Sequence, residues 1–112
     1  MLFLNGFLES TFVETSDSII GCIYKHPQMP INDFNSFYLK NVLNKLRKEN
    51  KKNFLMGDFN IDLLNSTKDN NIDMFLDEMY SLFLQPQINL PTRITSFSKT
   101  LIDNIFANNH FY

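Results

Sequence analysis

The chain has 112 residues, a length typical of one domain, and 44% of them are hydrophobic. This composition excludes a disordered tail, and its twelve phenylalanines predict an aromatic core. The formal net charge of −2 is not the strongly basic charge by which many nucleic-acid-binding proteins are recognised.

One short basic stretch departs from this balance. Lys45, Arg47, Lys48, Lys51 and Lys52 fall within eight residues. The favoured interpretation is the solvated end of a helix, where cations interact well with the helix dipole. The alternative is a patch that faces phosphate groups.

The start of the chain and its single cysteine indicate the cellular compartment. The first apolar run is interrupted by Asn5, Gly6 and Glu9, so it is too short for a signal peptide or a membrane span. Cys22 lies in an apolar run, and we expect a reduced core residue because a disulfide needs a partner. We therefore expect an intracellular, soluble protein.

Hydrophobic patterning predicts six elements in the order strand, strand, helix, strand, helix, strand. Residues 7–14 alternate loosely, and residues 18–24 and 53–59 are apolar runs typical of buried strands. Helical spacing runs from Phe34 to the basic end near Lys52 and again over residues 72–82. Residues 85–99 are extended and contain prolines, and residues 100–107 are a last apolar strand. This order predicts an α/β fold with helices packed on a sheet.

Two of these strands carry acids. Asp58, Asn60 and Asp62 follow Gly57 and alternate with apolar residues, so in a strand they would share one face. Asp103 lies inside the apolar run LIDNIF. Because a buried carboxylate is costly without a partner, such residues can hold a divalent cation or orient a water molecule. The alternative is equally strong: the first three begin a turn, and Asp103 caps a neighbouring group.

A calcium loop is a further, weaker alternative. Asp58, Asn60 and Asp62 match the first half of an EF-hand loop, and Asp69 falls at its last position. The position that requires glycine is Leu63, the last position is not glutamate, and a strand precedes the loop. These departures disfavour the calcium loop.

Three motifs in order suggest a family. GCIYKHP, FLMGDFNIDLL and LPTRIT…SKTLIDNIFAN resemble successive motifs of the endonuclease/exonuclease/phosphatase superfamily, from about Glu9 to Asn108. They are most similar to the apurinic-type endonuclease domain of non-LTR (LINE-like) retrotransposons. The resemblance implies a four-layer α/β sandwich, Mg²⁺-dependent hydrolysis of a phosphodiester, and DNA as partner.

The resemblance also implies a role for each matching residue. Asp58 would position or deprotonate the attacking water, and Asn60 would hold the scissile phosphate. The same two residues would lie next to the metal. Tyr24 would lie near the phosphate and Thr92 near the DNA strand. Asp103 would orient a catalytic histidine.

Other residues that the resemblance implies are not found in this sequence. Glu9 and Glu14 lie too close to the IYKHP motif to match the metal-binding glutamate of an earlier strand. No Ser-Asp-His triplet follows Asp103, and His110 lacks the preceding Ser-Asp. We expect His110 to be a residue of a frayed end and His26 to be an exposed loop residue.

We therefore expect residues 1–112 to form an incomplete domain that exposes sheet edges and apolar faces, through which it can self-associate. Three functions stay open. The first is a fragment of a Mg²⁺-dependent DNA endonuclease of a mobile element, inactive as an isolated chain and nuclear in location. The second is a truncated or decayed open reading frame with at most a binding role. The third is a phosphatase of the same superfamily.

Overall fold

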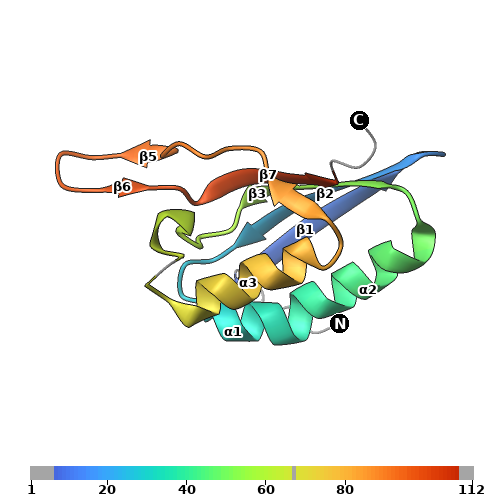
Figure 1. Ribbon diagram of the computed structural model, residues 1–112, viewed down its shortest axis with the longest axis horizontal. Coiled ribbons are helices and arrows are strands. Elements are labelled where there is room, and N and C mark those ends of the chain that lie inside the picture. The colour runs from blue at the N-terminus through green and yellow to red at the C-terminus, as the bar shows by residue number, and fades with distance from the viewer. Residues whose placement is uncertain (1–6, 67, 109–112) are drawn as a thin grey trace.

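The computed structural model describes residues 7–66 and 68–108 and confirms the predicted α/β class (Figure 1). Its centre is a five-stranded sheet in the order β1-β2-β3-β7-β4. The strands are β1 (Leu8–Glu14), β2 (Ser18–Lys25), β3 (Lys52–Asp58), β7 (Asp103–Asn108) and β4 (Leu84–Pro86). Only β2 and β3 are parallel neighbours in this sheet.

Two helical segments connect the strands. The crossover that parallel strands require is one helical run, formed by α1 (Ile31–Asp33), the π-helical turn η1 (Phe34–Leu39) and α2 (Lys40–Glu49). The short 3₁₀ helix η2 (Leu63–Asn65) and α3 (Asn70–Tyr80) follow β3. Both predicted helices are therefore confirmed. Within the described ranges, no helix combines the length and hydrophobicity that crossing a membrane requires.

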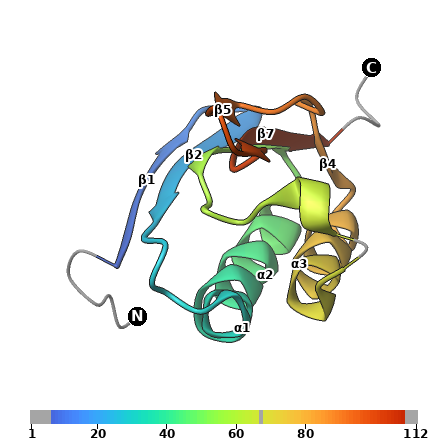
Figure 2. The ribbon, with the colours of Figure 1, turned by 90° about the vertical axis from the view of Figure 1, so that its left-hand side faces the viewer.

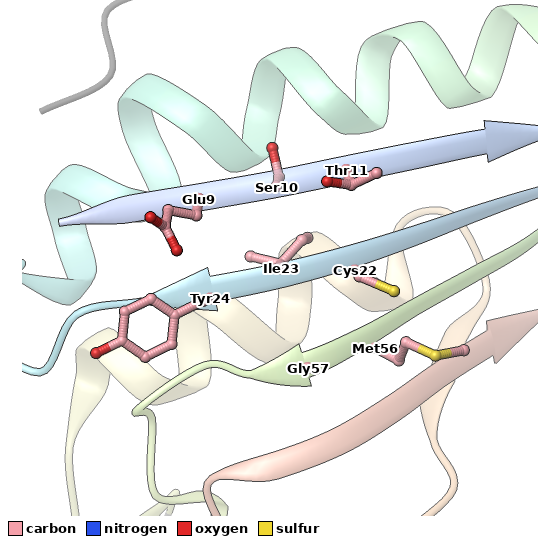
Figure 3. A pocket seen from close by; sticks show the side chains of 8 residues that line it. All are labelled: Glu9, Ser10, Thr11, Cys22, Ile23, Tyr24, Met56 and Gly57. Carbon is pink, nitrogen blue, oxygen red and sulfur yellow. The ribbon is translucent and has the colours of Figure 1, made fainter. Parts of the chain in front are cut away.

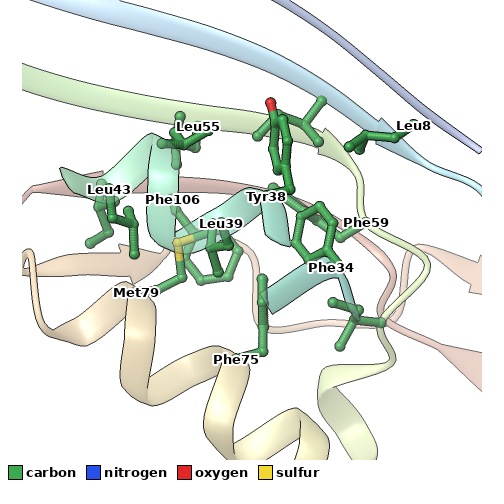
Figure 4. Packing of buried hydrophobic residues seen from close by; sticks show 14 of the residues in the cluster. Leu8, Phe34, Tyr38, Leu39, Leu43, Leu55, Phe59, Phe75, Met79 and Phe106 are labelled. Carbon is green, nitrogen blue, oxygen red and sulfur yellow. The ribbon is translucent and has the colours of Figure 1, made fainter. Parts of the chain in front are cut away.

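Both helices pack on the same face of the sheet, and the core lies between these two layers (Figure 2). Its centre is a cluster of aromatic rings from Phe34, Phe59, Phe75 and Phe106 (Figure 4). Neighbouring ring centroids are 5.5–6.1 Å apart, within the range favourable for aromatic pairs. The predicted aromatic core is confirmed.

The opposite face of the sheet is open, and two predictions fail there. Residues 18–24 are not buried on both faces, and Cys22 is exposed and not part of the core. Apolar side chains share this exposure, with Val13 56% and Ile105 36% exposed. The physical reason is that the helices cover only one side. The described residues thus form two layers, one sheet and one layer of helices, where the resemblance implies four.

The segment predicted only as extended contains more structure than expected. Part of it forms edge strand β4, and part forms a hairpin of β5 (Arg93–Ile94) and β6 (Lys99–Thr100). This hairpin projects beyond the sheet (Figure 1). The last strand begins at Asp103 instead of residue 100, because the hairpin takes up the preceding residues.

The basic stretch lies where α2 ends, which agrees with the favoured interpretation. Arg47 donates hydrogen bonds to Asn44 and Ser81, and Lys51 pairs with Glu14. These residues precede or begin β3, whereas Asp58 ends that strand. The basic stretch therefore lies at the opposite end of the sheet from Asp58.

Gly57 controls how closely β3 approaches β2 directly before Asp58. Its φ is +145°, a conformation that L side chains rarely adopt. A Cβ at this position would lie 1.9 Å from the carbonyl oxygen of Ile23 in β2. No side chain can be accommodated without moving one of the two strands.

We expect Gly57→Ala to lower the free energy of unfolding by about 4 kcal/mol or more, because the backbone of β2 or β3 must shift. Urea denaturation followed by circular dichroism measures the change. Gly21→Ala is the matched control. Its Cβ would meet the ring of Phe12, a 41% exposed side chain that can move, and the tip of the buried Leu55 side chain at 2.9 Å, and no backbone atom of a neighbouring strand is among its nearest contacts. We expect a loss of about 1–2 kcal/mol. Equal losses would contradict the assigned role of Gly57.

The open face predicts concentration-dependent self-association. Val13→Lys places a charge on edge strand β1 beside that face, and we expect it to shift the chain toward monomer. Phe37→Lys is the control, because Phe37 is 69% exposed on the helical layer. Sedimentation velocity at several concentrations measures both variants. If they reduce association equally, general hydrophobicity and not the open face is responsible.

Candidate active site

Three predicted site residues lie side by side across the sheet. Tyr24 of β2 is in register with Asp58 of β3, and Asp58 is in register with Asp103 of β7. Residues in register on neighbouring strands point to the same face, which here is the open one. Glu9 of β1 continues the row beyond Tyr24. A shallow hollow over β1, β2 and β3 includes Glu9 and Tyr24 in its lining (Figure 3).

Both carboxylate oxygens of Asp58 are engaged. Oδ1 accepts a hydrogen bond from the backbone N–H of Asn60, at 3.0 Å. Oδ2 accepts one from Nη2 of Arg93, also at 3.0 Å. The side chain is 20% exposed. Asp58 is therefore held in one orientation and stays partly exposed to solvent.

Asn60 lies beside Asp58, but not on a strand. The strand ends at Asp58, and Asn60 has a φ of +48°. Its Nδ2 donates to the carbonyl oxygen of Lys25, at 2.5 Å, which ties this turn to the end of β2. Of the two alternatives for Asp58, Asn60 and Asp62, the turn is therefore the one found, and the predicted strand over residues 53–59 ends one residue earlier, at Asp58. Asparagine tolerates the left-handed conformation better than most residues, and the chain turns there.

Asp62 and Asp69 serve local structure instead of the site. The carboxylate of Asp62 accepts from the N–H groups of Leu64 and Leu101, capping η2 and holding the segment before β7. Asp69 caps α3 by accepting from the N–H of Asn71. Each of these acids binds a different part of the backbone, an arrangement that disfavours the calcium-loop alternative.

Thr92 is joined to the row of Tyr24, Asp58 and Asp103 by a hydrogen bond with Asp103. The backbone N–H of Asp103 donates to Oγ1 of Thr92, at 3.3 Å, and the N–H of Thr92 donates to the carbonyl of Thr100. The segment before Thr92 is fixed by Asn104, which is 4% exposed and bonds both the N–H and the carbonyl of Ile88. The structure therefore brings together all five predicted residues, in a row with two flanking turns.

Arg93 belongs to the same site, and the sequence analysis did not identify it. Its Nη2 lies 3.0 Å from Asp58 Oδ2, and its Nε lies 3.9 Å from Asp103 Oδ2. Like charges directly opposite each other on neighbouring strands are destabilising, so one guanidinium between the two acids offsets their repulsion. The sequence feature that could have identified Arg93 is its position directly after Thr92 in the LPTRIT motif.

The structure tests the prediction for only one of the two histidines. His26 is half-buried, not fully exposed as predicted, and its Nδ1 accepts from the N–H of Gln28. Its ring packs edge-on near Tyr24, with centroids 6.5 Å apart. His110 lies outside the described residues.

A buried lysine supports the turn that carries Asn60. Lys25 is 1% exposed, and its Nζ donates to the carbonyls of Met29, at 2.9 Å, and His26, at 3.3 Å. Burial lowers the pKa of Lys25, and the nearby charge of Asp58 opposes that shift. The sequence pattern offered no sign that this lysine would be internal.

The described residues do not form a complete magnesium site. Asp58, Asn60 and Asp103 provide the oxygen atoms that Mg²⁺ prefers. However, residues 7–66 and 68–108 hold no group of three or more His, Cys, Asp or Glu side chains that could enclose a metal. Both oxygens of Asp58 also accept hydrogen bonds already.

Comparison with known proteins identifies the fold. The sequence matches no protein-family model and no curated protein. Among solved structures it is similar to the endonuclease domain of TRAS1, a telomere-specific non-LTR retrotransposon, with a TM-score of 0.61 and 21% identity. That match covers 91% of this chain and 48% of the other. A second match is an endonuclease/exonuclease/phosphatase family protein from Leptotrichia buccalis C-1013-b, at 20% identity and TM-score 0.48, covering 90% and 42%.

The chain spans about half the length of the structures it matches. At this level of identity the likeness concerns the fold alone. The described sheet and helices therefore have the fold of about half of the TRAS1 endonuclease domain.

The buried lysine predicts how stability depends on pH. Below its ordinary value of 10.5, the lowered pKa of Lys25 means that the unfolded chain holds a proton that the folded chain releases, so stability rises with pH there. Burial raises the pKa of Tyr38 above 10.0, which makes stability fall as pH rises above 10.0. We expect Lys25→Met to abolish the rise and leave the fall.

Urea unfolding across the alkaline range measures this change. The exposed Lys45→Met is the control, and we expect it to keep the wild-type profile. A profile for Lys25→Met that still rises below 10.5 would assign the effect to another group.

Proposed function

We propose that this chain is part of a phosphodiesterase that nicks DNA, of the kind that non-LTR retrotransposons encode. One observation carries the proposal: Tyr24, Asp58 and Asp103 share one lateral row at the open face of the sheet. Asn60 and Thr92 are hydrogen-bonded to members of that row. These are the five residues that the motifs select, although they are far apart in the sequence.

The proposed roles follow from the chemistry of each group. Asp58 is an oriented, partly exposed carboxylate, suited to hold or deprotonate an attacking water. Tyr24 and Asn60 carry donors that stabilise the charge developing on a phosphodiester. Thr92 places a hydroxyl between the hairpin and the row. In the longer protein that we propose, Asp103 orients a catalytic histidine that is neither His26 nor His110.

Magnesium is the cofactor that the resemblance implies, and its donor set is incomplete among the described residues. Asp58 and Asn60 would supply at most one carboxylate and one amide. In the longer domain we propose, the remaining ligands come from a segment that corresponds to the other half of the compared endonuclease. Such an ion would neutralise phosphate charge during cleavage.

If this chain carries only part of the site, the isolated chain lacks some of the groups that cleavage needs. Residues 1–112 are proposed to be a partial domain that is inactive alone, with DNA as the substrate of the longer protein. A nuclear location follows if that protein acts on chromosomal DNA. The incomplete donor set is the observation that supports a non-catalytic relic as the second candidate.

Mutation of Asp58 tests the enzymatic proposal in the protein produced from the complete transcript that encodes this chain. We expect Asp58→Asn to reduce nicking of supercoiled plasmid by about 10³-fold, since it removes the water-orienting base. Asp62→Asn is the matched control, because Asp62 caps η2 and we expect its variant to retain nicking per folded molecule.

Circular dichroism reports whether each variant folds, and agarose electrophoresis reports nicking. An Asp58→Asn protein that nicks at the wild-type rate per folded molecule would refute the enzymatic proposal. If the transcript encodes nothing more than residues 1–112 and the chain does not nick, the relic is the correct interpretation. Release of inorganic phosphate from small phosphate monoesters, without nicking, would identify a phosphatase.

A further inference from the structure

We infer that the solvent side of the η1–α2 helical run binds a single-stranded nucleic acid, at a surface separate from the candidate active site. We call this surface the basic helix face. It consists of six exposed residues: Phe37, Lys40, Asn41, Asn44, Lys45 and Lys48. The inference does not rest on the proposed nuclease, because it uses none of the residues of that site.

The charges of this chain are unevenly distributed. Residues 40–52 contain six of the ten Lys and Arg residues but only one of the twelve Asp and Glu residues, Glu49. The remainder of the chain is therefore acidic, although the net charge of the whole chain is only −2. A polyanion is attracted to the basic segment and repelled by the rest of the molecule, so only this part of the chain offers it a favourable approach.

Helical spacing places polar and basic side chains on the side of α2 that faces away from the core. Val42, Leu43 and Leu46 are buried. Asn41 and Lys48 lie on the exposed side, where residues three and four positions apart are neighbours. Residues 34–48 contain no acidic residue. The helix dipole accounts for cations in the last turn of α2, but it does not account for a whole helix face without acids.

Lys45 and Lys48 are the cations of this face that a ligand can use. Neither forms an ion pair in the part of the chain that the structure describes. Lys40, by contrast, pairs with Glu78 of α3, at 3.7 Å. Because a lysine that neutralises a phosphate releases a counterion from the nucleic acid, both free cations would contribute to binding.

An exposed aromatic ring on the same face favours a single strand over a duplex. Phe37 is 69% exposed, and Nδ2 of Asn41 donates to its carbonyl oxygen at 2.9 Å, so the two residues lie on adjacent turns of one face. Unpaired bases stack on aromatic side chains, and cations beside the ring hold the backbone. A base stacked on Phe37 would direct the next phosphates along the face toward Lys45 and Lys48.

The basic helix face is remote from the row of site residues. The helical run lies in the helical layer, and α2 ends on the side of the molecule opposite the β5–β6 hairpin (Figure 1). Lys52, just beyond α2, begins β3, and Asp58 ends it. These two ends are about 20 Å apart, because a strand rises about 3.3 Å per residue. A strand bound at Lys45 and Lys48 therefore does not lie over Asp58.

Fluorescence anisotropy of a labelled oligothymidylate of about 15 nucleotides, titrated with the 112-residue chain, tests the inference. We expect saturable binding at about 50 mM salt that weakens steeply as the salt concentration rises. We expect Lys45→Gln/Lys48→Gln to raise the Kd by about tenfold and to reduce the salt dependence by about 1.4 logarithmic units per decade, since each phosphate contact to a single strand contributes about 0.7.

Lys68→Gln/Lys99→Gln is the matched control. It removes the same charge from two exposed residues outside the basic helix face, one of them on the hairpin. We expect this pair to change the Kd by less than about twofold, because long-range charge is largely screened. Glutamine is a good helix former, and circular dichroism checks that each variant keeps its helices.

Phe37→Leu separates stacking from charge. It keeps an apolar residue on the helix and removes the ring. We expect it to raise the Kd for oligothymidylate by at least about fivefold and to leave the salt dependence unchanged. An unchanged Kd would remove Phe37 from the surface and overturn the assignment to a single strand.

The remaining outcomes also decide the question. Equal weakening by the two double variants would reduce the effect to net charge and overturn the inference, as would a wild-type chain that does not bind. Tighter binding of a duplex of the same length, or binding of phosphatidylserine vesicles without binding of the oligonucleotide, would assign the face to another ligand. Asp58→Asn should bind oligothymidylate like the wild type, so failure of the nicking test would refute the proposed function and leave this inference standing.

Discussion

The position of β3 between β2 and β7 is the constraint on which the site depends. β3 is parallel to one neighbour and antiparallel to the other, and its last residue is in register with both Tyr24 and Asp103. Gly57 permits this arrangement by letting the backbone of β3 pass close to Ile23. A shift of one residue in either register would turn the acids away from each other and toward the helices.

Because the helices cover only one face of the sheet, the side chains on its other face stay exposed. The aromatic cluster and α2 and α3 bury one side of the sheet, and the row of polar residues occupies the end of the side left open. Apolar neighbours such as Ile105 share that side. Polar and apolar side chains therefore share the face of the sheet that the helices leave open.

Buried amides hold the irregular segments against the strands. Asn104 binds the backbone at Ile88, and Asn108 binds the backbone of Asn53 and Leu82. The Asn104 contacts fix the segment that leads to Thr92 and Arg93 against β7, although that segment contains little regular structure. In this way the site gains a threonine and an arginine from a hairpin that extends away from the sheet.

The sequence by itself determined the order of elements, the helices, the aromatic core and the acids at strand ends, because these follow from local periodicity and residue chemistry. Motif resemblance selected Tyr24, Asp58, Asn60, Thr92 and Asp103. Only the tertiary structure decided that Cys22 is exposed, that Lys25 is buried, and that Asp62 caps a helix. It also decided that Arg93 lies between Asp58 and Asp103. These outcomes depend on which face the helices cover and on contacts between residues distant in sequence, and a local pattern contains neither.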